Sequence, residues 1–382
     1  MSAILPGSTI GILGGGQLGR MTAMAARSLG YRVQVMDPDP SCPARFVVDA
    51  CFEGSWNDAR AAADLARGCD VVTLEIEQVS IASLEAAQKF APVRPGIAMM
   101  RTIQDRILQR EWLVKHGFPV GEFRAIHTET DLQNAVPALG SRCFVKSARG
   151  GYDGRSQVKI GFGEITHSAE AEIREAWRLL GGLPAVAEKA LDLEKEISVM
   201  VARTPDGEIR SYPAATNHHE HQILAWSVIP SSIPSAQEDG AQEIARRIAE
   251  EMQLEGVLAV ELFVTRDGFL LVNELAPRPH NSYHASERAC VTSQFEQIVR
   301  AVCNLPLGDV SMIKPAAIAN LLGDLWLNHE PYFDKALAVP GVRLHLYEKH
   351  QPRSGRKMGH LSAIGDSPEE AVARVLEAKD LL

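Results

Sequence analysis

The spacing of apolar residues in the first third of the chain predicts a parallel sheet. Short apolar runs alternate there with longer stretches of helical periodicity. Strands are expected at Thr9–Leu13, Arg32–Met36, Val47–Ala50 and Asp70–Leu74, and helices at Gln17–Leu29 and Asp58–Arg67. Regular alternation of strand and helix is typical of a parallel sheet with helices on both faces. We therefore expect an α/β domain at the N-terminus.

Beyond a linker-like segment at Pro92–Pro95, the pattern changes. Gly96–Gly117 has helical periodicity, and Ser235–Gln253 has the pattern of an amphipathic helix. Between them, several short apolar runs have the composition of strands. These strands are expected at Arg142–Lys146, Ser156–Ile160, Val186–Lys189 and Glu194–Val201. Strands joined by short connections pair antiparallel, so this part of the chain is expected to be α+β.

Two longer apolar runs, Val257–Thr265 and Phe269–Leu275, flank the dipeptide Asp267-Gly268. Asp-Gly between apolar runs is a strong signal for a two-residue hairpin turn. Because each run is apolar on either side of a glutamate, we expect the hairpin to lie in the middle of a sheet and to be largely buried.

The predicted turn places two acidic side chains opposite each other. In the register of a two-residue turn, Glu261 faces Glu274. Like charges in directly opposed positions are destabilising, so a cation is expected between them. Carboxylates together with phosphate oxygens are common ligands of Mg²⁺. The alternatives are a register that separates the glutamates, or an ion pair between one of them and Arg278.

The composition is that of an ordinary globular protein and excludes several classes. The chain has 382 residues, 46% of them hydrophobic and 23% charged, which predicts two or three domains with a sizeable core. A net charge of −9 argues against a nucleic-acid-binding protein. No apolar run is long enough to span a membrane, and the N-terminus lacks the pattern of a signal peptide.

The cysteines indicate a reducing compartment. The sequence has six cysteines and no CxxC pair, so reduced thiols are expected rather than a disulfide framework or a zinc site. They are Cys42, Cys51, Cys69, Cys143, Cys290 and Cys303. A cytoplasmic protein is therefore expected.

A glycine-rich turn follows the first predicted strand. Gly14, Gly16 and Gly19 match the G-x-G-x-x-G fingerprint of dinucleotide-binding proteins, and Asp37 lies at the end of the next strand. A nicotinamide- or flavin-dependent oxidoreductase is therefore one hypothesis. The alternative is that the glycines admit another phosphate or polar ligand to a helix N-terminus. No recognisable oxidoreductase site follows in the sequence.

Two acidic residues, Glu75 and Glu77, lie at the end of the fourth predicted strand. Ligands of open α/β sheets bind at the carboxyl ends of the strands. These glutamates are therefore candidate ligand-binding residues, with a solvated surface pair as the alternative.

The segment Ala148–Arg155 has the composition of a phosphate-binding flap. Its glycines permit close approach of the backbone, and successive N–H groups can form an anion-binding nest. Lys146 lies on the strand just before it. Because the segment joins two strands, it is not a Walker-type loop, which runs from a strand into a helix. It is predicted to be a mobile lid near residues 148–156, or else a plain hairpin with a glycine-rich tip.

Further polar candidates lie on the segments that follow. The E-K-A-L segment at 188–191 and Glu196 suit a nucleoside site, in which backbone groups bind the adenine and a carboxylate binds the ribose hydroxyls. An exposed strand charge is the alternative for Glu196. On a predicted loop, His218, His219 and His221 could bind Zn²⁺, but no set of cysteines or carboxylates completes such a site nearby in the sequence.

These motifs together resemble those of the ATP-grasp ligases. The shared features are the lysine before a glycine-rich flap, the E-K-x-L segment and the Glu…Asn-Glu hairpin. Within this superfamily the chain is similar to the N5-carboxyaminoimidazole ribonucleotide synthetases of purine biosynthesis. The matching stretches span nearly the whole chain and are ILGGGQLGRM (12–21), VMDPDP (35–40), GGYDGR (150–155) with Gln157, NELAPRPHNS (273–282) and GRKMGH (355–360).

The resemblance implies the fold and its domains. It implies a mixed α/β and α+β architecture, with a Rossmann-like parallel-sheet domain, an ATP-grasp domain and a small β-rich C-terminal domain. The expected boundaries are 1–95, 96–308 and 309–382.

The resemblance also implies the reaction. ATP, bicarbonate and 5-aminoimidazole ribonucleotide would give N5-carboxyaminoimidazole ribonucleotide, ADP and phosphate through carboxyphosphate. Mg²⁺ is the implied metal, with Mn²⁺ as the alternative, and a homodimer is the implied assembly. No nucleic-acid or membrane partner is expected.

Site residues are implied position by position. ATP would be bound by Arg106, Lys146, Gly151, Tyr152, Asp153, Gly154, Arg155, Ser156, Gln157, Glu188, Lys189, Ala190, Leu191, Glu196, His219, Asn273 and Glu274. The ribonucleotide would be bound by Gln17, Leu18, Glu75, Tyr152, Arg278, His280, Asn281, Lys349, Arg356 and Lys357. The metal would be bound by Glu261 and Glu274. The implied catalytic residues are Lys146, Asp153, Arg278 and His280, with Asp153 and His280 both open as the base.

The sequence departs from the family pattern at several positions. Tyr283 and Ser156 stand where the family usually has glycine, and the strand end at Glu75 reads E-I-E-Q instead of E-F-E-N. Of these changes, Tyr283 is expected to alter the substrate fit most.

Two related hypotheses remain open. One is another ATP-grasp ligase, such as a formate-dependent glycinamide ribonucleotide transformylase, which usually has Asp where Asn281 stands, or a biotin carboxylase, which is longer. The other is a catalytically inactive nucleotide sensor, against which the retention of Lys146, Glu261 and Glu274 argues.

Overall fold

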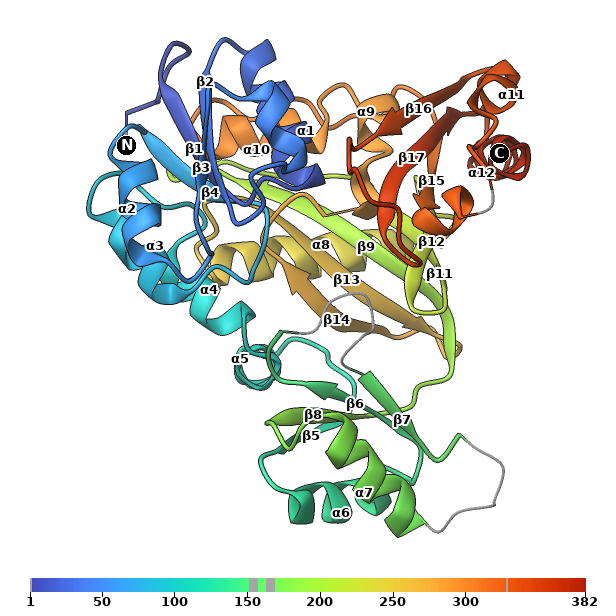
Figure 1. Ribbon diagram of the computed structural model, residues 1–382. Helices are drawn as coiled ribbons and strands as arrows, with labels where there is room; N and C mark the ends of the chain where they lie inside the picture. Colours follow the sequence, from blue (N-terminus) through green and yellow to red (C-terminus); the bar gives the residue numbers. More distant parts are fainter. Residues whose placement is uncertain (1, 151–156, 163–168, 328) are drawn as a thin grey trace. The chain divides into compact units, whose positions relative to one another are not determined.

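The computed structural model describes residues 2–150, 157–162, 169–327 and 329–382 (Figure 1). The chain divides into two compact units. Unit 1 consists of Met1–Met100, Glu196–Glu261 and Leu275–Leu382, and unit 2 consists of Arg101–Lys195 and Leu262–Glu274. The division therefore passes through both strands of the predicted acidic hairpin.

Unit 1 begins with the predicted parallel sheet. Its strands are β1 (Thr9–Leu13), β2 (Arg32–Asp37), β3 (Ala50–Glu53) and β4 (Val71–Leu74), in the order β3-β2-β1-β4, and its helices are α1 (Gln17–Ser28), α2 (Ala59–Ala66) and α3 (Ile81–Gln88). All neighbouring strands pair in parallel, which confirms the prediction. The third strand begins later than predicted, because Pro43–Val47 forms a short 3-10 helix, η1, with Pro43 at its first position.

A nine-stranded sheet follows. Its order is β14 (Leu270–Ala276), β13 (Gly256–Thr265), β9 (Leu193–Arg203), β11 (Ala215–Glu220), β12 (Ile223–Ile229), β15 (Ala316–Leu322), β17 (Lys357–Ile364) and β16 (Val342–Leu346), with β10 (Ile209–Ser211) paired to β9. Contrary to expectation, β14 ends this order, so the hairpin is not in the middle of the sheet. Its outer edge is still covered, because the Val272 N–H donates to the Pro119 carbonyl at 2.8 Å.

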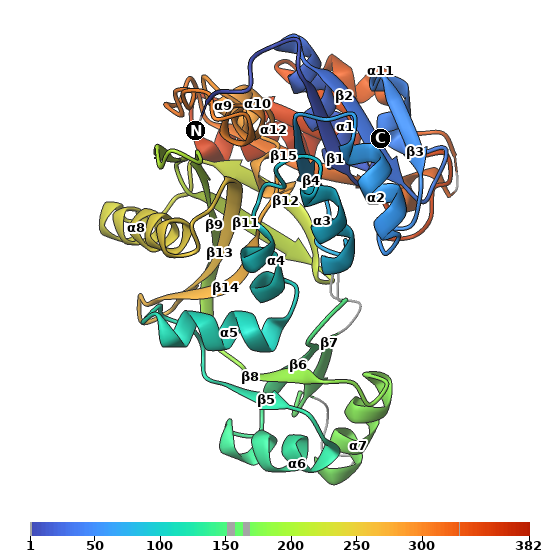
Figure 2. The ribbon, with the colours of Figure 1, turned by 90° about the vertical axis from the view of Figure 1, so that its left-hand side faces the viewer.

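Helices pack on the strands of unit 1. The long helix α8 (Ser235–Glu251) runs beside β9 and β13 in both views (Figures 1 and 2). At the C-terminus, α12 (Pro368–Asp380) places Ala371, Val375 and Ala378 in one apolar cluster with residues of β15 and β17. The shorter elements are η2 (Asn281–Tyr283), α9 (Ser286–Ala289), α10 (Gln294–Val302), η3 (Gly323–Trp326) and α11 (Phe333–Ala338).

Unit 2 is built on a smaller antiparallel sheet. Its strands are β5 (Phe123–Ile126), β8 (Ala185–Lys189), β6 (Cys143–Ser147) and β7 (Gln157–Ile160), in that order, and its helices are α5 (Arg106–Lys115), α6 (Glu129–Ala138) and α7 (Ala169–Leu179). The predicted Gly96–Gly117 helix is two helices, α4 (Ile97–Ile103) and α5. The break falls at Asp105, whose carboxylate accepts from the N–H groups of Ile107 and Leu108 and so caps α5.

The hairpin turn has one residue more than predicted. The Gly268 N–H donates to the Thr265 carbonyl at 2.8 Å, and the Thr265 N–H donates to the Phe269 carbonyl at 3.0 Å. Gly268 has a φ of 88°, which fits a three-residue loop with a glycine bulge. The prediction of a two-residue turn is wrong, and the direct opposition of Glu261 and Glu274 does not follow from the turn.

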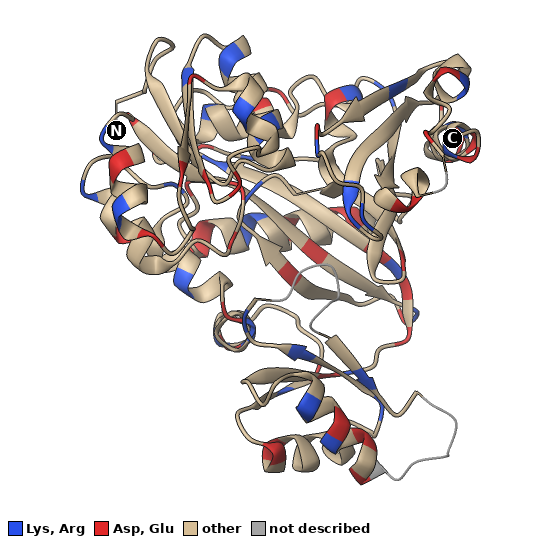
Figure 3. Ribbon diagram, viewed as in Figure 1, with Lys and Arg blue, Asp and Glu red and all other residues tan. Residues whose placement is uncertain are grey.

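Charged residues of both signs are interspersed along the ribbon (Figure 3). Within the described ranges, no helix is both long and apolar enough to cross a membrane.

Three imidazoles gather in unit 1, two of them buried (His284 and His360) and one half-buried (His345). The His360 ring lies 4.9 Å from the His284 ring and 5.1 Å from the His345 ring, measured between centroids, and the His360 Nδ1 lies 2.8 Å from the Tyr347 hydroxyl. Burial lowers the pKa of His360 to about 3, and burial also lowers the pKa of His284 and of His345. The folded protein therefore keeps these side chains neutral.

The fold should lose stability as the pH falls from 6.5 towards 3. An unfolded histidine binds its proton near pH 6.5, while His360 in the folded state does so only near pH 3. At about pH 5 this difference removes about 2 kcal/mol from the free energy of unfolding for His360 alone. We expect His360→Gln to reduce this loss of unfolding free energy at low pH, measured by urea unfolding. Substitution of the exposed His127 by Gln should leave the pH dependence unchanged. If the unfolding free energy varied equally with pH in the two variants, the effect could not be assigned to His360.

Candidate active site

The predicted glycine turn is held by two carboxylates of the chain itself. The N–H groups of Gly16 and Gly19 donate to the two oxygens of Glu75 at 2.5 and 2.6 Å, and the Gly15 N–H donates to Asp37 at 2.7 Å. A Cβ at Gly16 would lie 2.5 Å from the Glu75 carboxylate, so this position requires glycine. Burial raises the pKa of Glu75, and the backbone donors partly offset that effect. Because carboxylates occupy these amide donors, the turn does not support the dinucleotide hypothesis.

Gln17 and Lys349, both predicted to bind the ribonucleotide, contact each other. The Lys349 Nζ donates to the Gln17 side-chain oxygen at 2.5 Å and to the Lys357 carbonyl at 2.7 Å. Arg356 donates to the Gln351 carbonyl at 2.8 Å. The Leu18 side chain is buried in an apolar cluster with Phe295 and Tyr347, so only its backbone remains available to a ligand.

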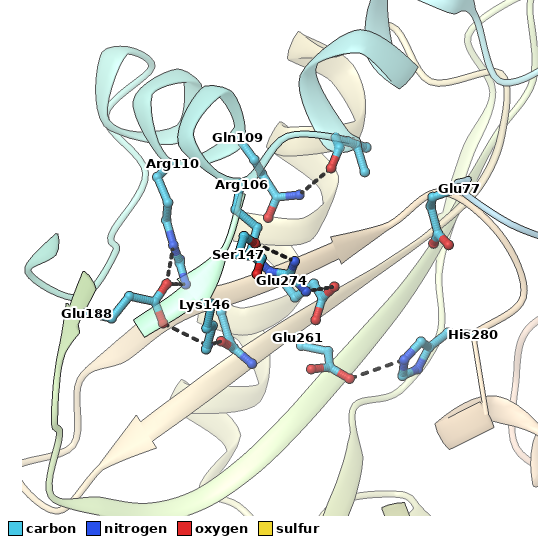
Figure 4. Close-up of polar contacts among 12 residues, drawn as sticks. Glu77, Arg106, Gln109, Arg110, Lys146, Ser147, Glu188, Glu261, Glu274 and His280 are labelled. Carbon is cyan, nitrogen blue, oxygen red and sulfur yellow. Dashed lines mark hydrogen bonds and ion pairs between the residues drawn. The ribbon is translucent and has the colours of Figure 1, made fainter. Parts of the chain in front are cut away.

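Arg278 is held by Glu77, the second of the two glutamates that follow the fourth strand. Its Nε lies 2.7 Å from the Glu77 carboxylate, and both side chains are mostly buried. Glu75 and Glu77 both follow β4 in the sequence, but only Glu75 was predicted to bind the ribonucleotide. Figure 4 shows Glu77.

The residues after the hairpin form a second polar group in unit 1. The His280 Nε2 lies 3.2 Å from Glu261, and the His280 Nδ1 lies 2.8 Å from the Ser282 hydroxyl. Next to them, the Asn281 side chain is 7% exposed, and within the described chain neither its amide oxygen nor its amide nitrogen has a hydrogen-bond partner. A buried amide without partners costs about 1–3 kcal/mol, which is the property of a group that binds a ligand.

Tyr283 does not play the expected part in substrate fit. Its side chain is fully buried, and its hydroxyl lies within hydrogen-bond distance of the carbonyls of Ser198 and Pro213, at 2.8 and 2.9 Å, which share its one proton. Its ring also contacts the ring of Tyr212. The tyrosine therefore fills the core and is anchored there by its hydroxyl.

The three neighbouring histidines do not form the predicted loop. His218 and His219 belong to β11, with a bulge between them, and His221 lies in the turn after it. His219 lies 2.9 Å from Glu196, while His218 stacks on Trp226. Burial opposes the charge on His219, but the hydrogen bond and charge of Glu196 raise its pKa. The zinc hypothesis for this segment is therefore wrong.

One other group, Glu287, His345 and His360, has metal-ligand atoms within 4.8 Å of one another in the described chain. The planes of the two imidazoles are only 11° apart. The two rings are stacked, so their in-plane lone pairs lie in separate, nearly parallel planes, and the His360 Nδ1 is already paired with the Tyr347 hydroxyl. This arrangement does not favour a shared ion.

The predicted ATP residues of unit 2 gather around Glu188 (Figure 4). The Lys146 Nζ lies 2.7 Å from Glu188 and 3.4 Å from the Asn273 side-chain oxygen. Arg110 binds the same carboxylate through Nε at 2.8 Å and donates to the Val272 carbonyl at 2.6 Å. Burial opposes the charge on Glu188, but the two cations lower its pKa to about 2. Glu188 is therefore ionised and shared by Lys146 and Arg110.

Arg106 and Glu274 form the other end of this group. An Arg106 guanidinium nitrogen lies 3.6 Å from Glu274, and another donates to the Ser147 carbonyl at 3.1 Å. Gln157 pairs with Lys146 across β6 and β7. Nearby on β8, Lys189 lies 3.5 Å from Glu122, and the Ala190 N–H donates to the Arg142 carbonyl, just before Leu191. The predicted ligands Gly151, Tyr152, Asp153, Gly154, Arg155 and Ser156 lie outside the described residues.

Arg110 was missed by the sequence analysis. It follows Arg106 by four residues, and on a helix that spacing places both side chains on one face. The spacing could have indicated Arg110, but its partner Glu188 is 78 residues away.

Arg110→Lys is expected to raise the KM for ATP about tenfold. Lysine cannot bind a carboxylate and a carbonyl through one planar fork, and a hydrogen bond to a charged group contributes about 1.5–3 kcal/mol. Glu188 would then be held less firmly beside Lys146. Initial rates against ATP concentration measure the change, with Arg124→Lys, an exposed arginine of the same unit, as the control. An unchanged KM would show that Arg110 has only a structural role.

The chain matches the sequence models of three protein families. These are the ribonucleotide synthetase preATP-grasp domain at residues 7–104, the ATP-grasp domain at 111–295 and the phosphoribosylaminoimidazole carboxylase C-terminal domain at 316–374. They follow one another along nearly the whole chain.

Curated relatives and solved structures match at full length. N5-carboxyaminoimidazole ribonucleotide synthase of Bacillus subtilis is 37% identical over 97% of this chain and 95% of its own. The Staphylococcus aureus N5-carboxyaminoimidazole synthetase complexed with ADP has a TM-score of 0.91 at 34% identity, over 99% of this chain and 98% of its own. The Aspergillus clavatus enzyme, in complex with ADP and 5-aminoimidazole ribonucleotide, has a TM-score of 0.88 at 32% identity and covers 98% of each chain. By this similarity along its whole length, the chain belongs to the N5-carboxyaminoimidazole ribonucleotide synthases of the ATP-grasp superfamily.

Proposed function

We propose that the protein carboxylates 5-aminoimidazole ribonucleotide with bicarbonate at the expense of ATP. The products are N5-carboxyaminoimidazole ribonucleotide, ADP and phosphate, in the de novo synthesis of purines. The full-length similarity to an enzyme complexed with ADP and the same ribonucleotide carries this proposal. The ionised Glu188, shared by Lys146 and Arg110, supports it because charged side chains are already gathered where the phosphates of ATP are expected.

ATP would be bound by residues from several segments of the chain. In unit 2, Lys146, Arg106, Gln157 and the segment 151–156 would hold the phosphates, and the segment 188–191 would hold the adenine. In unit 1, Glu196 and His219 would hold the ribose; their 2.9 Å contact supports a pre-formed carboxylate–imidazole pair. Because Lys146 already contacts Glu188, it would exchange one anionic partner for another when the phosphates bind.

Mg²⁺, or alternatively Mn²⁺, would be held by Glu261 and Glu274, with the amide of Asn273 next to them. Carboxylate oxygens are hard ligands of the kind that these ions prefer. Bound there, the ion would neutralise charge on the ATP phosphates. Arg106 beside Glu274 and His280 beside Glu261 would orient the two carboxylates.

The ribonucleotide would be bound by residues of unit 1. The buried Asn281 amide, which lacks partners in the described chain, supports this assignment most directly. Lys349, Arg356 and Lys357 would bind the 5′-phosphate, since ammonium and guanidinium groups bind phosphate through charge-assisted hydrogen bonds. The other ligands would be Gln17, the backbone of Leu18, Glu75, Tyr152, Arg278 and His280.

The chemistry would be phosphoryl transfer followed by carboxylation. Bicarbonate would attack the γ-phosphate of ATP to give carboxyphosphate, with Lys146 and Arg278 neutralising the developing charge. Closure of the flap near 148–156 would exclude water from this fragile intermediate. The exocyclic amine would then take the carboxyl group as a base removes its proton, with Asp153 and His280 as the two candidates.

An ADP-release assay with each substrate omitted in turn tests the function. ADP should form only when bicarbonate and 5-aminoimidazole ribonucleotide are both present. ATP binding without ribonucleotide-dependent ADP release would instead indicate a nucleotide sensor. Stabilisation by a nicotinamide cofactor and not by Mg-ATP would restore the oxidoreductase hypothesis. A homodimer and a cytoplasmic location belong to the same proposal and are supported by the family resemblance.

A further inference from the structure

A chain of buried side chains joined by hydrogen bonds leads away from His280 in unit 1. The Ser282 hydroxyl lies 2.8 Å from the His280 Nδ1 and 2.8 Å from the Ser198 hydroxyl. Asn217 stands at the far end, with its amide nitrogen 3.2 Å and its amide oxygen 3.5 Å from the Ser198 hydroxyl. Ser198 and Ser282 are fully buried, and Asn217 is 6% exposed. Asn217, Ser198 and Ser282 are called the hydroxyl relay below.

The carboxylate of Glu261, which faces the other ring nitrogen of His280, fixes the direction of every hydrogen bond in this chain. Glu261 lies 3.2 Å from the His280 Nε2 and, when ionised, can only accept. A neutral His280 must therefore carry its proton on Nε2, which leaves Nδ1 as an acceptor. Ser282 has a single proton and must donate it to Nδ1. Its oxygen then accepts from Ser198, and Ser198 in turn accepts from the amide nitrogen of Asn217.

The amide end agrees with the direction set at the carboxylate end. Asn217 approaches Ser198 more closely with its nitrogen, which can only donate, than with its oxygen. The three hydrogen bonds and the contact with Glu261 are therefore oriented the same way, and such chains strengthen each hydrogen bond by polarisation. In the opposite direction Ser198 would donate to the Asn217 oxygen over the longer 3.5 Å contact, and a lone pair of His280 would face the Glu261 carboxylate.

We infer that Asn217, Ser198 and Ser282 are positioning residues that hold His280 as the Nε2–H tautomer, a hydrogen-bond donor to Glu261. The inference rests on the proposed function for its catalytic consequence. His280 then orients a carboxylate proposed to bind the metal and has no lone pair on Nε2 with which to act as a base. Of the two candidate bases, this leaves Asp153.

The relay can be reversed by one nearly isosteric change. Asn217→Asp replaces the terminal donor by an acceptor, so Ser198 would turn its proton towards the new carboxylate. Ser282 would then donate to Ser198 and accept from the His280 Nδ1–H. The imidazole would become the Nδ1–H tautomer, and Glu261 would lose the His280 Nε2–H as a donor.

The test is nitrogen-15 NMR of the histidine side chains in the full-length protein without nucleotide. Comparison with His280→Gln identifies the resonances of His280. The wild type should show the Nε2–H form, Asn217→Asp should show the Nδ1–H form, and Ser198→Ala should show a mixture. Ser198→Thr keeps the hydroxyl and should restore the wild-type form. The matched control is Ser227→Ala, which removes another fully buried hydroxyl, one that donates to the Ser282 carbonyl at 2.7 Å and lies outside the relay.

Kinetics provide a second measurement. Changes around metal ligands lower activity about 10- to 100-fold. Asn217→Asp should therefore lower kcat at least about tenfold, and Ser227→Ala should keep kcat near wild type. An Nδ1–H tautomer in the wild type, or an unchanged tautomer in both Asn217→Asp and Ser198→Ala, would overturn the inference. If the tautomers are as expected but the protein shows no ribonucleotide-dependent ADP release, the hydroxyl relay is supported and the proposed function is refuted. If Asn217→Asp fails to fold, the Ser198→Ala and Ser198→Thr pair decides.

Discussion

Glu274→Gln is expected to lower turnover by at least about a hundredfold and to leave the fold intact. Glutamine keeps the shape of the side chain but removes the charge that would hold Mg²⁺. The Glu274 side chain is half exposed, and its 3.6 Å contact with Arg106 is a partly solvated ion pair. Such pairs contribute little to stability, so the melting temperature should change by only a few degrees.

The measurement is ADP release at saturating ATP, bicarbonate and ribonucleotide, together with a thermal melt. The control is Glu122→Gln, a similarly exposed glutamate of unit 2 that pairs with Arg124. A higher Mg²⁺ concentration should recover part of the activity of Glu274→Gln, since the lost interaction is with the ion. Near-wild-type turnover would mean that the metal is bound elsewhere.

Lys146→Met should lower kcat/KM for ATP by about two to three orders of magnitude. Methionine replaces the ammonium group with a thioether of similar length, so the charge expected to face the phosphates is lost. Glu188 would keep Arg110 as a partner, because Arg110 binds it through two nitrogens at 2.8 and 2.5 Å. The carboxylate is therefore not left buried and unpaired, and the fold should survive the change.

Single-turnover rates and ATP binding distinguish the two possible roles of Lys146. If the ammonium stabilises the transition state, kcat falls more than the affinity for ATP; if it only binds, the affinity falls and kcat is kept. Lys159→Met is the control, since Lys159 is exposed on the neighbouring strand β7 and packs on the Phe144 ring. Similar losses in both variants would argue against a specific role for Lys146.

Local sequence patterns predicted much of the fold correctly. The alternation of strands and helices identified the parallel sheet of unit 1, because helix and strand periods are set by neighbouring residues. The motifs identified the family and named Lys146, Arg106, Glu196 and Arg278, all of which the structure places in ion pairs. The prediction of the hairpin turn was wrong by one residue, so the direct opposition of Glu261 and Glu274 no longer follows from it.

The tertiary structure alone decided which distant residues meet. Arg110 binds Glu188 from 78 residues away, and Ser198 meets Ser282 from 84 residues away. Nothing in the spacing of either pair marks it, because strand order and helix packing set such contacts and local periodicity does not. The sequence by itself determined the alternating elements and the polar residues that the chain carries at their ends. The fold determined that these residues share carboxylates, and it set the direction in which the hydrogen bonds around His280 run.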